Sequence, residues 1–218
     1  MRKPIRGLYA ITPDLVDTPL LLCKVRAALQ GGAQTLQYRN KSADSTLRLQ
    51  QAQALRQLTR EFDATFIVND DAQLAARVDA DGVHLGGDDG SLEAARDMLG
   101  DAKIIGVSCY NRESLALAAV RAGADYVAFG AFFPSGVKPQ AVRAEPQLLA
   151  WARGELALPV VAIGGITAQN GAALIAAGAD ALAVISAVFD AEDICSSAQE
   201  FSTLFSRVRH DISKPNVI

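Results

Sequence analysis

Three polar side chains at the end of an apolar segment are the best candidates for chemistry in this sequence. Gln37, Arg39 and Lys41 alternate along the chain, so an extended strand turns all three to one side. Two cations on one side of a buried segment are costly unless an anion meets them. The pattern therefore indicates a local anion site, although a half-exposed strand with a solvated polar face would show the same alternation.

Two aspartates further along the chain are candidate metal ligands. Asp70 and Asp89 offer the carboxylate oxygens that Mg²⁺ takes, and this ion leaves most of its shell to water and substrate phosphates. Taken singly, each aspartate could instead cap the helix that follows it. Together with Arg39, Lys41 and Lys138 they favour magnesium and a diphosphate, because arginine clamps phosphate through a planar fork and lysine through a point charge.

The composition limits the class of protein and the kind of partner. The chain has 218 residues, half of them apolar, which suffices for one folded domain with a substantial core. Its net charge of -3 provides no basic field for nucleic acid or for an anionic membrane surface, so we expect any anion site to be local. Cys23, Cys109 and Cys195 are odd in number and widely spaced, which indicates neither a disulfide framework nor a zinc site and fits a reducing cytoplasm.

The elements that position these side chains follow from the hydrophobic pattern. Short apolar runs suited to buried strands recur eight times, with segments of helical length, rich in alanine and leucine, between them. The predicted strands are 7–11, 35–38, 65–69, 82–85, 103–108, 126–129, 160–163 and 181–184, and the predicted helices include 45–61, 91–99, 112–122 and 167–177. The uncharged stretch 156–179 contains turn residues that divide it, so it is not read as a membrane span.

This alternation of strand and helix predicts parallel strands joined by right-handed crossovers. Small residues recur between a helix end and the next strand at 31–34, 80–82, 123–125 and 178–180, where glycine is expected to provide a left-handed cap. Eight units without a linker favour a closed (β/α)₈ barrel, one domain over 1–218 with a flexible tail at 211–218. An open doubly wound sheet is the alternative. It is weakened because the Gly-x-Gly-x-x-Gly motif of dinucleotide-binding sheets does not follow the first strand.

A barrel of this kind places its site at the carboxyl ends of the strands, and the polar residues sort to that end. Arg39 and Lys41 follow the second predicted strand, Asn69 and Asp70 close the third, Asp89 follows the fourth, Ser108 ends the fifth and Lys138 follows the sixth. Residues 164–167 and 185–188 follow the last two strands, the usual place for a phosphate held by backbone amides, although a plain tight turn would look the same. Two phosphate sites imply two phosphorylated substrates or halves.

His84 is predicted to be a hydrogen-bonded core histidine and Cys109 a small buried side chain.

Seven ordered segments resemble the thiamine phosphate synthase family and together cover essentially the whole chain. They are 37–41, 69–70, 82–86 with Asp89, 106–108, 130–135 with Lys138, 164–166 and 184–187. The resemblance implies a (β/α)₈ barrel that joins 4-amino-2-methyl-5-(diphosphooxymethyl)pyrimidine to a thiazole ethyl phosphate, or its carboxylated form, and releases diphosphate. It also implies one Mg²⁺ per active site, small-molecule partners and a cytoplasmic enzyme, and it leaves the oligomeric state open.

Position by position, the resemblance also implies roles. Asp70 and Asp89 would bind magnesium, and the catalytic residues would be Arg39, Lys41, Lys138 and Ser108. The substrates would be bound by Gln37, Tyr38, Arg39, Asn40, Lys41, Asn69, Ser108, Ser135, Gly136, Val137, Lys138, Gly165, Ile185 and Ser186. Departing diphosphate would leave a cation-like methylene for the thiazole nitrogen to attack, so positioning and charge stabilisation would supply the acceleration without a protein nucleophile.

The chain departs from the family pattern at three places. Val137 stands where a threonine is common, which removes a phosphate-facing hydroxyl, Gly87 replaces a common glutamine, and Cys109 and Tyr110 stand where threonine and histidine are frequent. Two alternative functions are kept, the second of them because of Val137. One is a thiazole tautomerase-like barrel, which needs no diphosphate and magnesium site, and the other is a non-catalytic thiamine phosphate binding protein.

Overall fold

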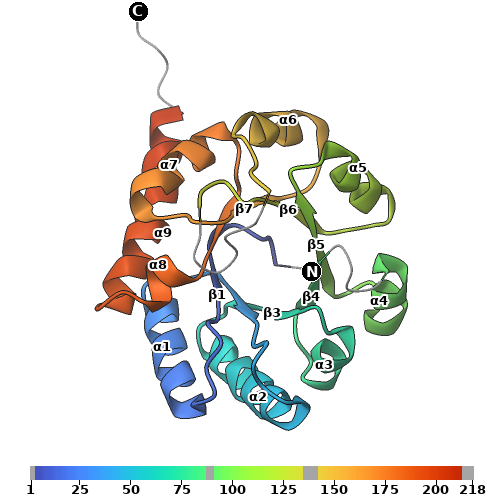
Figure 1. The fold of residues 1–218 in the computed structure, drawn as a ribbon, viewed down its shortest axis with the longest axis vertical. Helices are drawn as coiled ribbons and strands as arrows, with labels where there is room; N and C mark the ends of the chain where they lie inside the picture. The colour runs from blue at the N-terminus through green and yellow to red at the C-terminus, as the bar shows by residue number, and fades with distance from the viewer. Residues whose placement is uncertain (1–2, 87–90, 135–141, 213–218) are drawn as a thin grey trace, which may run out of the picture.

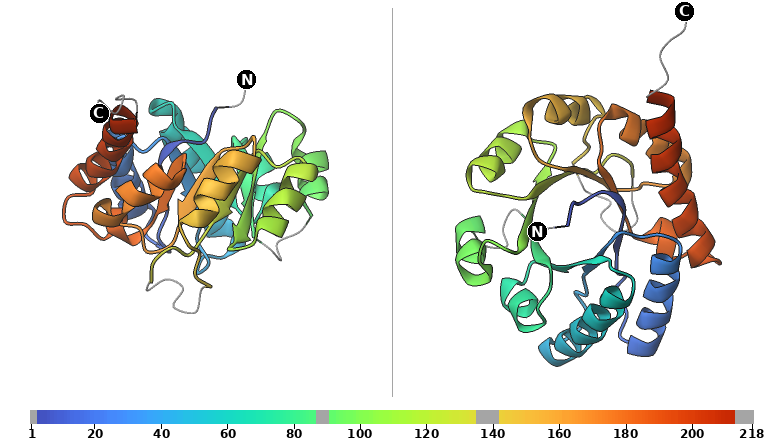
Figure 2. Two further views of the ribbon diagram at one scale, coloured as in Figure 1. Left: turned by 90° about the horizontal axis from the view of Figure 1, so that it is seen from above. Right: turned by 180° about the vertical axis from the view of Figure 1, so that it is seen from behind.

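A closed barrel of eight parallel strands forms the centre of the molecule. The computed structural model describes residues 3–86, 91–134 and 142–212, the last four of them by backbone alone. The strands pair in chain order, and β8 (Ala181–Val184) pairs with β1 (Gly7–Ile11) to close the ring, with helices around the outside (Figure 1, Figure 2). The predicted (β/α)₈ barrel is confirmed.

The strands between these two lie close to their predicted positions. They are β2 (Thr35–Tyr38), β3 (Thr65–Asn69), β4 (Gly82–Leu85), β5 (Ile104–Tyr110), β6 (Tyr126–Phe129) and β7 (Val160–Ile163). The prediction of 103–108 was wrong for β5, which begins one residue later and runs two residues further. Its register with β6 shifts between Ser108 and Tyr110, and Tyr110 has a φ of 54°, so a local irregularity lets the strand continue past Ser108.

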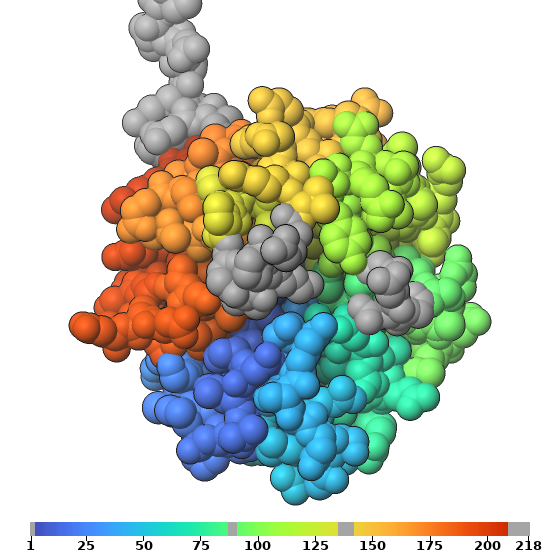
Figure 3. Space-filling model, in the orientation of Figure 1, coloured from blue at the N-terminus to red at the C-terminus, as the bar shows by residue number. Residues whose placement is uncertain are grey.

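The helices alternate with the strands and form the outer layer. They are α1 (Thr18–Gln30), α2 (Ser45–Glu61), α3 (Ala72–Arg77), α4 (Leu92–Leu99), α5 (Glu113–Arg121), α6 (Gln147–Glu155), α7 (Ala168–Ala177), α8 (Ser186–Phe189) and α9 (Ile194–Ile212). In the space-filling view the blue surface of α1 lies beside the orange-red surface of α8 and α9 (Figure 3). α9 continues through Ile212, two residues into the expected tail, and 213–218 lie outside the described residues. Within the described ranges, no helix has the length and apolar content needed to cross a membrane.

Strand alternation divides the apolar side chains into two layers. One layer, which includes Leu36 and Phe66, lies between the sheet and the helices. The other fills the inside of the barrel and includes Ile5, Tyr9 and Tyr126. Ile5 is 3% exposed and precedes β1, and Figure 2 shows the segment that carries it crossing one opening of the barrel. Burying one such large apolar side chain contributes roughly 1.5–3 kcal/mol.

Aspartates at three helix-to-strand junctions tie neighbouring strands together. Each carboxylate accepts a hydrogen bond from a backbone amide of the preceding strand, and each aspartate's own amide donates to the carbonyl of that same residue at 2.8 Å. The bonds to the carboxylates run from Phe66, Ile105 and Val160 to Asp81, Asp125 and Asp180, at 2.8, 2.8 and 2.9 Å. We call these three residues the junction aspartates. They lie at the amino ends of the strands, where barrel residues serve stability.

At the four predicted helix-to-strand junctions, the residue with a positive φ is a glycine in three cases and an aspartate in the fourth. Gly32, Gly123 and Gly178 have φ values of 97°, 86° and 128°, as predicted. At 80–82 the glycine prediction was wrong, because Asp79, just upstream, takes the left-handed conformation with a φ of 51°. Gly82 instead allows a close approach, since a Cβ there would lie 2.0 Å from the Ile104 carbonyl oxygen.

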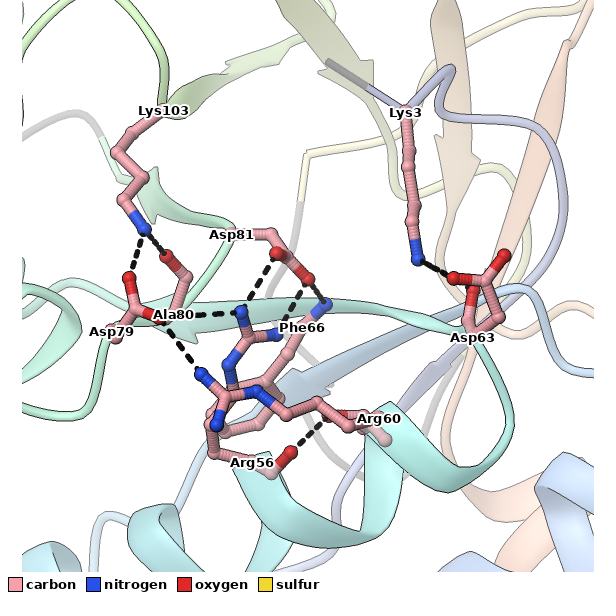
Figure 4. Close-up of polar contacts among 10 residues, drawn as sticks. Lys3, Arg56, Arg60, Asp63, Phe66, Asp79, Ala80, Asp81 and Lys103 are labelled. Atoms are coloured by element: carbon pink, nitrogen blue, oxygen red, sulfur yellow. Dashed lines mark hydrogen bonds and ion pairs between the residues drawn. The ribbon is translucent and has the colours of Figure 1, made fainter. Parts of the chain in front are cut away.

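A charged network surrounds one junction aspartate at this end of the barrel (Figure 4). The Arg56 guanidinium donates to both carboxylate oxygens of Asp81, at 2.9 and 3.1 Å, and its side chain is only 13% exposed. Lys103 donates to Asp79 at 2.6 Å, and this hydrogen bond holds the pKa of Asp79 below its ordinary value. The network joins α2 to the turns before β4 and β5.

Candidate active site

A cavity of about 760 Å³ opens among the carboxyl ends of the strands. Its size lies within the range of small-molecule sites, which is roughly 300–1,000 Å³. The predicted site residues that line it are Gln37, Arg39, Lys41, Asn69, Asp70, Ser108, Gly165, Ile185 and Ser186. Residues that lie far apart in the sequence, from Gln37 to Ser186, therefore meet at one end of the barrel.

Tyr38 and Asn40, two of the predicted substrate-binding residues, form hydrogen bonds outside the cavity. The Tyr38 hydroxyl donates to Gln51 on α2 at 2.9 Å, and the Asn40 amide donates to the same oxygen at 3.0 Å and to the Leu15 carbonyl at 2.7 Å. These contacts fix α2 and the loop after β1 against β2, outside the residues that line the cavity. Ser135, Gly136, Val137, Lys138 and Asp89 lie outside the described residues.

Arg39 lies at the cavity with its charge already paired. The Thr12 hydroxyl accepts from the Arg39 amide and donates to its carbonyl, both at 2.8 Å, which fixes the backbone where β2 ends. Arg39 Nη1 lies 3.2 Å from each carboxylate oxygen of Asp14, and Asp14 also accepts from the Lys41 amide at 2.9 Å. Asp14 was not among the predicted site residues, because its loop carries no motif and its partners are known only once β1 and β2 are paired.

Asp70 is presented at the cavity by an uncommon backbone conformation. Its φ of 62° is left-handed, a state that non-glycine residues adopt mostly at turns and functional sites. The Asn69 amide donates to the Asp70 carboxylate at 2.6 Å, and the Asp70 amide donates to the His84 carbonyl at 2.8 Å. The capping alternative for Asp70 was wrong, because the N-cap of α3 is Asp71, whose side chain accepts from the Leu74 amide. The N-cap of α4 is Ser91.

The loops after β7 and β8 provide a second part of the cavity, lined by glycine and serine and also by Asp190. Gly164 and Gly165 have φ values of 103° and 61°, and a Cβ on Gly165 would lie 2.3 Å from the Pro134 carbonyl oxygen, so only glycine fits. Asn170 donates to the Gly165 carbonyl at 3.1 Å and accepts from the Thr167 amide at 2.8 Å, which locks this turn onto the start of α7. Ser186 begins α8 beside it.

A hydrogen-bonded row of polar side chains forms the floor of the cavity. Gln37 donates to the Tyr9 hydroxyl at 2.9 Å, which lies 2.8 Å from the Tyr126 hydroxyl. His84 Nδ1 lies 2.9 Å from the Tyr126 hydroxyl, and its Nε2 lies 2.9 Å from Ser108 Oγ. His84 is buried and hydrogen-bonded, as predicted, but it also lines the cavity. We call these five residues the floor chain.

The sequence reading missed Tyr9 and Tyr126. Both stand inside short apolar strands, where their rings read as core, and both are almost completely buried. Burial raises the pKa of each hydroxyl well above its ordinary value. Strand parity puts the Tyr9 and Gln37 side chains on the same side of the paired strands β1 and β2, but it does not show which distant side chain the Tyr9 hydroxyl meets.

Cys109 is a packing residue, as predicted. Its side chain is buried, and burial raises the pKa of its thiol to about 12. Within the described ranges, no three histidine, cysteine, aspartate or glutamate side chains cluster in a way that could hold a metal. Two described carboxylates line the cavity, Asp70 and Asp190. Asp70 is a hard oxygen donor on the same part of the cavity as Arg39 and Lys41, which suits an ion shared with a substrate phosphate.

Comparison with known proteins agrees with this geometry. The family model described as thiamine monophosphate synthase matches residues 8–188. A thiamine-phosphate synthase of Methylobacillus flagellatus is 58% identical over 203 residues, 93% of this chain and 97% of the relative. Another, of Thiobacillus denitrificans, is 56% identical over 206 residues, 94% and 98% of the two chains.

A solved structure has the same fold at lower identity. The thiamine phosphate pyrophosphorylase from Pyrococcus furiosus superposes with a TM-score of 0.83 at 39% identity, covering 93% of this chain and 96% of that one. Orotidine 5'-phosphate decarboxylase from Pyrococcus horikoshii, at 14% identity and a TM-score of 0.65, shares only the fold. This chain belongs to the thiamine monophosphate synthase family, a family of transferases.

Proposed function

We propose that this enzyme joins 4-amino-2-methyl-5-(diphosphooxymethyl)pyrimidine to a thiazole ethyl phosphate, or its carboxylated form, to give thiamine phosphate and diphosphate. The observation that carries the proposal is the composition of one cavity. Its β2 and β3 side has Arg39, Lys41 and Asp70, which suit a diphosphate, and its β7 and β8 side has Gly165 and Ser186, which suit a monophosphate. The name of the relatives, thiamine-phosphate synthase, supports the product, and the family resemblance supplies the identity of the two rings.

The residues present fit a bound magnesium ion. Asp70 would hold it from the described part of the cavity, and Asp89 is the second ligand that the family resemblance implies. When bound, Mg²⁺ would neutralise charge on the diphosphate oxygens. The Asn69 amide, 2.6 Å from the Asp70 carboxylate, would keep that carboxylate oriented.

The residues of the chain would act mainly on the departing diphosphate. The bond between the pyrimidine methylene and the diphosphate oxygen breaks, and the electron pair leaves with diphosphate. Arg39 and Lys41 would stabilise the growing negative charge, and we assign the same role to Lys138 from the family resemblance. The thiazole nitrogen lone pair then forms the new carbon–nitrogen bond, so no protein nucleophile is needed, and the uncarboxylated thiazole requires no net proton transfer. With the carboxylated form the bond to the carboxylate also breaks, CO₂ leaves, and the ring carbon takes one proton from water.

The remaining assignments rest on the resemblance and on chemistry. Ser135, Gly136 and Val137 would complete the thiazole phosphate site through backbone amides, and Ser108 would contact the pyrimidine. A cytoplasmic enzyme with small-molecule partners fits three cysteines that are unpaired in the structure. The partners would be the two phosphorylated precursors rather than nucleic acid or membrane.

The test is a coupling assay with both phosphorylated precursors, with and without Mg²⁺. We expect diphosphate and thiamine phosphate to appear in equal amounts and only with magnesium. Rearrangement of the thiazole without diphosphate release would select the tautomerase alternative, and tight product binding without turnover would select the binding protein.

The diphosphate role of Arg39 is tested in the same assay. Arg39→Ala should lower kcat by on the order of a hundredfold, since one lost transition-state contact of this kind costs about 2.7–4 kcal/mol. Arg26→Ala is the matched control, because Arg26 is half-exposed on α1 and pairs with Glu61 away from the cavity. Equal turnover in both variants would contradict the assigned role.

A further inference from the structure

The four-residue helix α8 presents the part of the cavity that we assign to the monophosphate. Ser186 and Ala187 in α8 and Asp190 directly after it line the cavity, on a different part of the chain from the floor chain and from Arg39 and Lys41. A helix of this length is not stable on its own, because ordering its first turn costs more conformational entropy than its few hydrogen bonds offset. Its position therefore depends on its contacts with the rest of the molecule.

Side chains from two other helices bind the carbonyl groups of α8, which contacts both α1 and α9 (Figure 1). Ser197 Oγ on α9 donates to the Ala187 carbonyl at 2.8 Å, and Lys24 Nζ on α1 donates to the Phe189 carbonyl at 2.7 Å. The other two carbonyls of α8 accept from backbone amides three and four residues further along, at 3.4 and 2.9 Å. All four carbonyls therefore have partners, although the last carbonyls of a helix have none within the helix itself.

Apolar contacts hold the same helix in place without orienting it. Val188 and Phe189 are fully buried, so they fix how deeply α8 lies against its neighbours. Burial of apolar surface has no preferred direction, whereas a hydrogen bond weakens steeply when its angle changes. The bonds from Lys24 and Ser197 therefore set the direction of the helix, and with it the place of Ser186 at the cavity.

The charges at this part of the cavity give Lys24 a second effect. Asp190 lines the cavity, and no lysine or arginine among the described residues after β7 or β8 lines it as well. A phosphate bound there would meet a like charge. The Lys24 ammonium is held at the carbonyl of Phe189, the residue directly before Asp190, so its positive charge offsets part of this repulsion.

Lys24 and Ser197 do not line the cavity, so both would act on a substrate through α8. We infer that they are positioning residues for the thiazole ethyl phosphate, because they hold Ser186 where its phosphate binds, and that Lys24 also offsets the charge of Asp190. The inference rests on the proposed function, since it takes the β7 and β8 side of the cavity as the monophosphate site.

Steady-state kinetics test the inference, with each precursor varied at a saturating concentration of the other. Lys24→Met and Ser197→Ala remove the two side-chain donors with little change in size. We expect the KM for thiazole ethyl phosphate to rise about tenfold in Lys24→Met and about fivefold in Ser197→Ala, since a charged donor contributes more than a neutral one. The kcat and the KM for the pyrimidine diphosphate should stay within about twofold of the wild type, because only the binding of one substrate is weakened.

The chain offers a matched control for each variant. Lys103→Met removes another partly buried ammonium that donates to a backbone carbonyl, that of Ala80, at 2.7 Å, but at the other end of the barrel. Ser202→Ala removes another hydroxyl of α9, which donates to the Gly31 carbonyl at 3.0 Å and not to α8. Both controls lose a comparable hydrogen bond and should keep the wild-type KM for both precursors.

A merely structural role for these side chains gives a different result. The two KM values would then rise together, and the midpoint of thermal unfolding would fall in parallel. That outcome, or an unchanged KM for thiazole ethyl phosphate in the folded variants, would overturn the inference. Lys24→Arg and Ser197→Thr each keep a donor and should restore the KM to within about threefold of the wild type. Should Lys24→Met fail to fold, Ser197→Ala still provides the test.

Salt separates the charge of Lys24 from its hydrogen bond. The ratio of the Lys24→Met KM to the wild-type KM should fall at high salt, because ions screen the charges, and the ratio for Ser197→Ala should not change. A Lys24→Met ratio that does not depend on salt would contradict the charge effect. Failure of the wild type to couple the two precursors would remove the proposed function itself, whereas normal coupling with unaffected variants would overturn this inference alone.

Discussion

Replacing Asp14 with asparagine should tighten the binding of diphosphate. In the structure the Arg39 guanidinium lies against the Asp14 carboxylate, 3.2 Å from both oxygens, so an incoming diphosphate must compete with an internal anion. Asparagine removes the charge but keeps an oxygen for the Lys41 amide, which now donates to Asp14 at 2.9 Å. The loop should therefore hold its position while Arg39 is released.

The magnitude follows from the distance and the exposure of the pair. Two unit charges 3.2 Å apart interact by about 1 kcal/mol in water and about 5 kcal/mol at an effective dielectric constant of about 20. The Arg39 and Asp14 side chains are 16% and 36% exposed, and measured pairs at solvent-facing positions contribute roughly 0.2–1 kcal/mol. We take about 1 kcal/mol, which is about a fivefold change in a dissociation constant.

The assay is product inhibition by inorganic diphosphate at low and at high salt. The inhibition constant should fall about fivefold in Asp14→Asn, with a smaller change at high salt because the ions screen the pair. Asp63→Asn changes the net charge equally at the other end of the barrel, where Asp63 pairs with Lys3, and serves as the control. The reasoning is refuted if Asp14→Asn binds diphosphate no more tightly than the wild type, or if the effect persists on an Arg39→Ala background.

Three further predictions concern the core and the amino end of the barrel. Gly106→Ala should lower the free energy of unfolding by about 1–3 kcal/mol in urea titrations, because its Cβ would overlap Tyr126; an unchanged midpoint would contradict the packing. Cys109, with a thiol pKa of about 12, should not react with a thiol reagent in the native enzyme at pH 8, so modification of all three cysteines there would be unexpected. The Lys103 hydrogen bond holds the pKa of Asp79 below its ordinary value of about 3.9, so its stabilisation is present above about pH 4 and is lost as the pH falls further. Asp79→Asn should therefore reduce the dependence of unfolding free energy on pH below 4, and identical acid unfolding curves would show that the pair contributes nothing.

The fold was predictable because local signals and the global architecture agree. The strand that ends at Asn69 and the strand that begins at Gly82 are bounded by turn residues, and both have the predicted limits. β5 was missed at its end because Tyr110 enters a left-handed conformation that the chain tolerates only through its pairing with β6. The junction before β4 was missed for a similar reason, since Asp79 and not Gly82 takes the turn.

Those cavity residues that lie at the carboxyl ends of strands were predictable from the sequence. Arg39, Asn69 and Ser108 could be placed because each lies at or near the carboxyl end of a strand, and parallel strands bring these ends together. Tyr9 and Tyr126 could not, because a buried tyrosine inside an apolar strand differs from a core phenylalanine only by a hydroxyl whose partners come from distant strands. Asp14 needed the pairing of β1 with β2 before its contact with Arg39 could be seen.

The junction aspartates join β3 to β4, β5 to β6 and β7 to β8, at the rim away from the cavity. These hydrogen bonds thus join the sheet in pairs of strands at the amino end, apart from the loops that meet substrates at the carboxyl end. Substitutions in those loops can therefore change the substrate, and substitutions near the junction aspartates can raise thermal stability, without one set of changes altering the other.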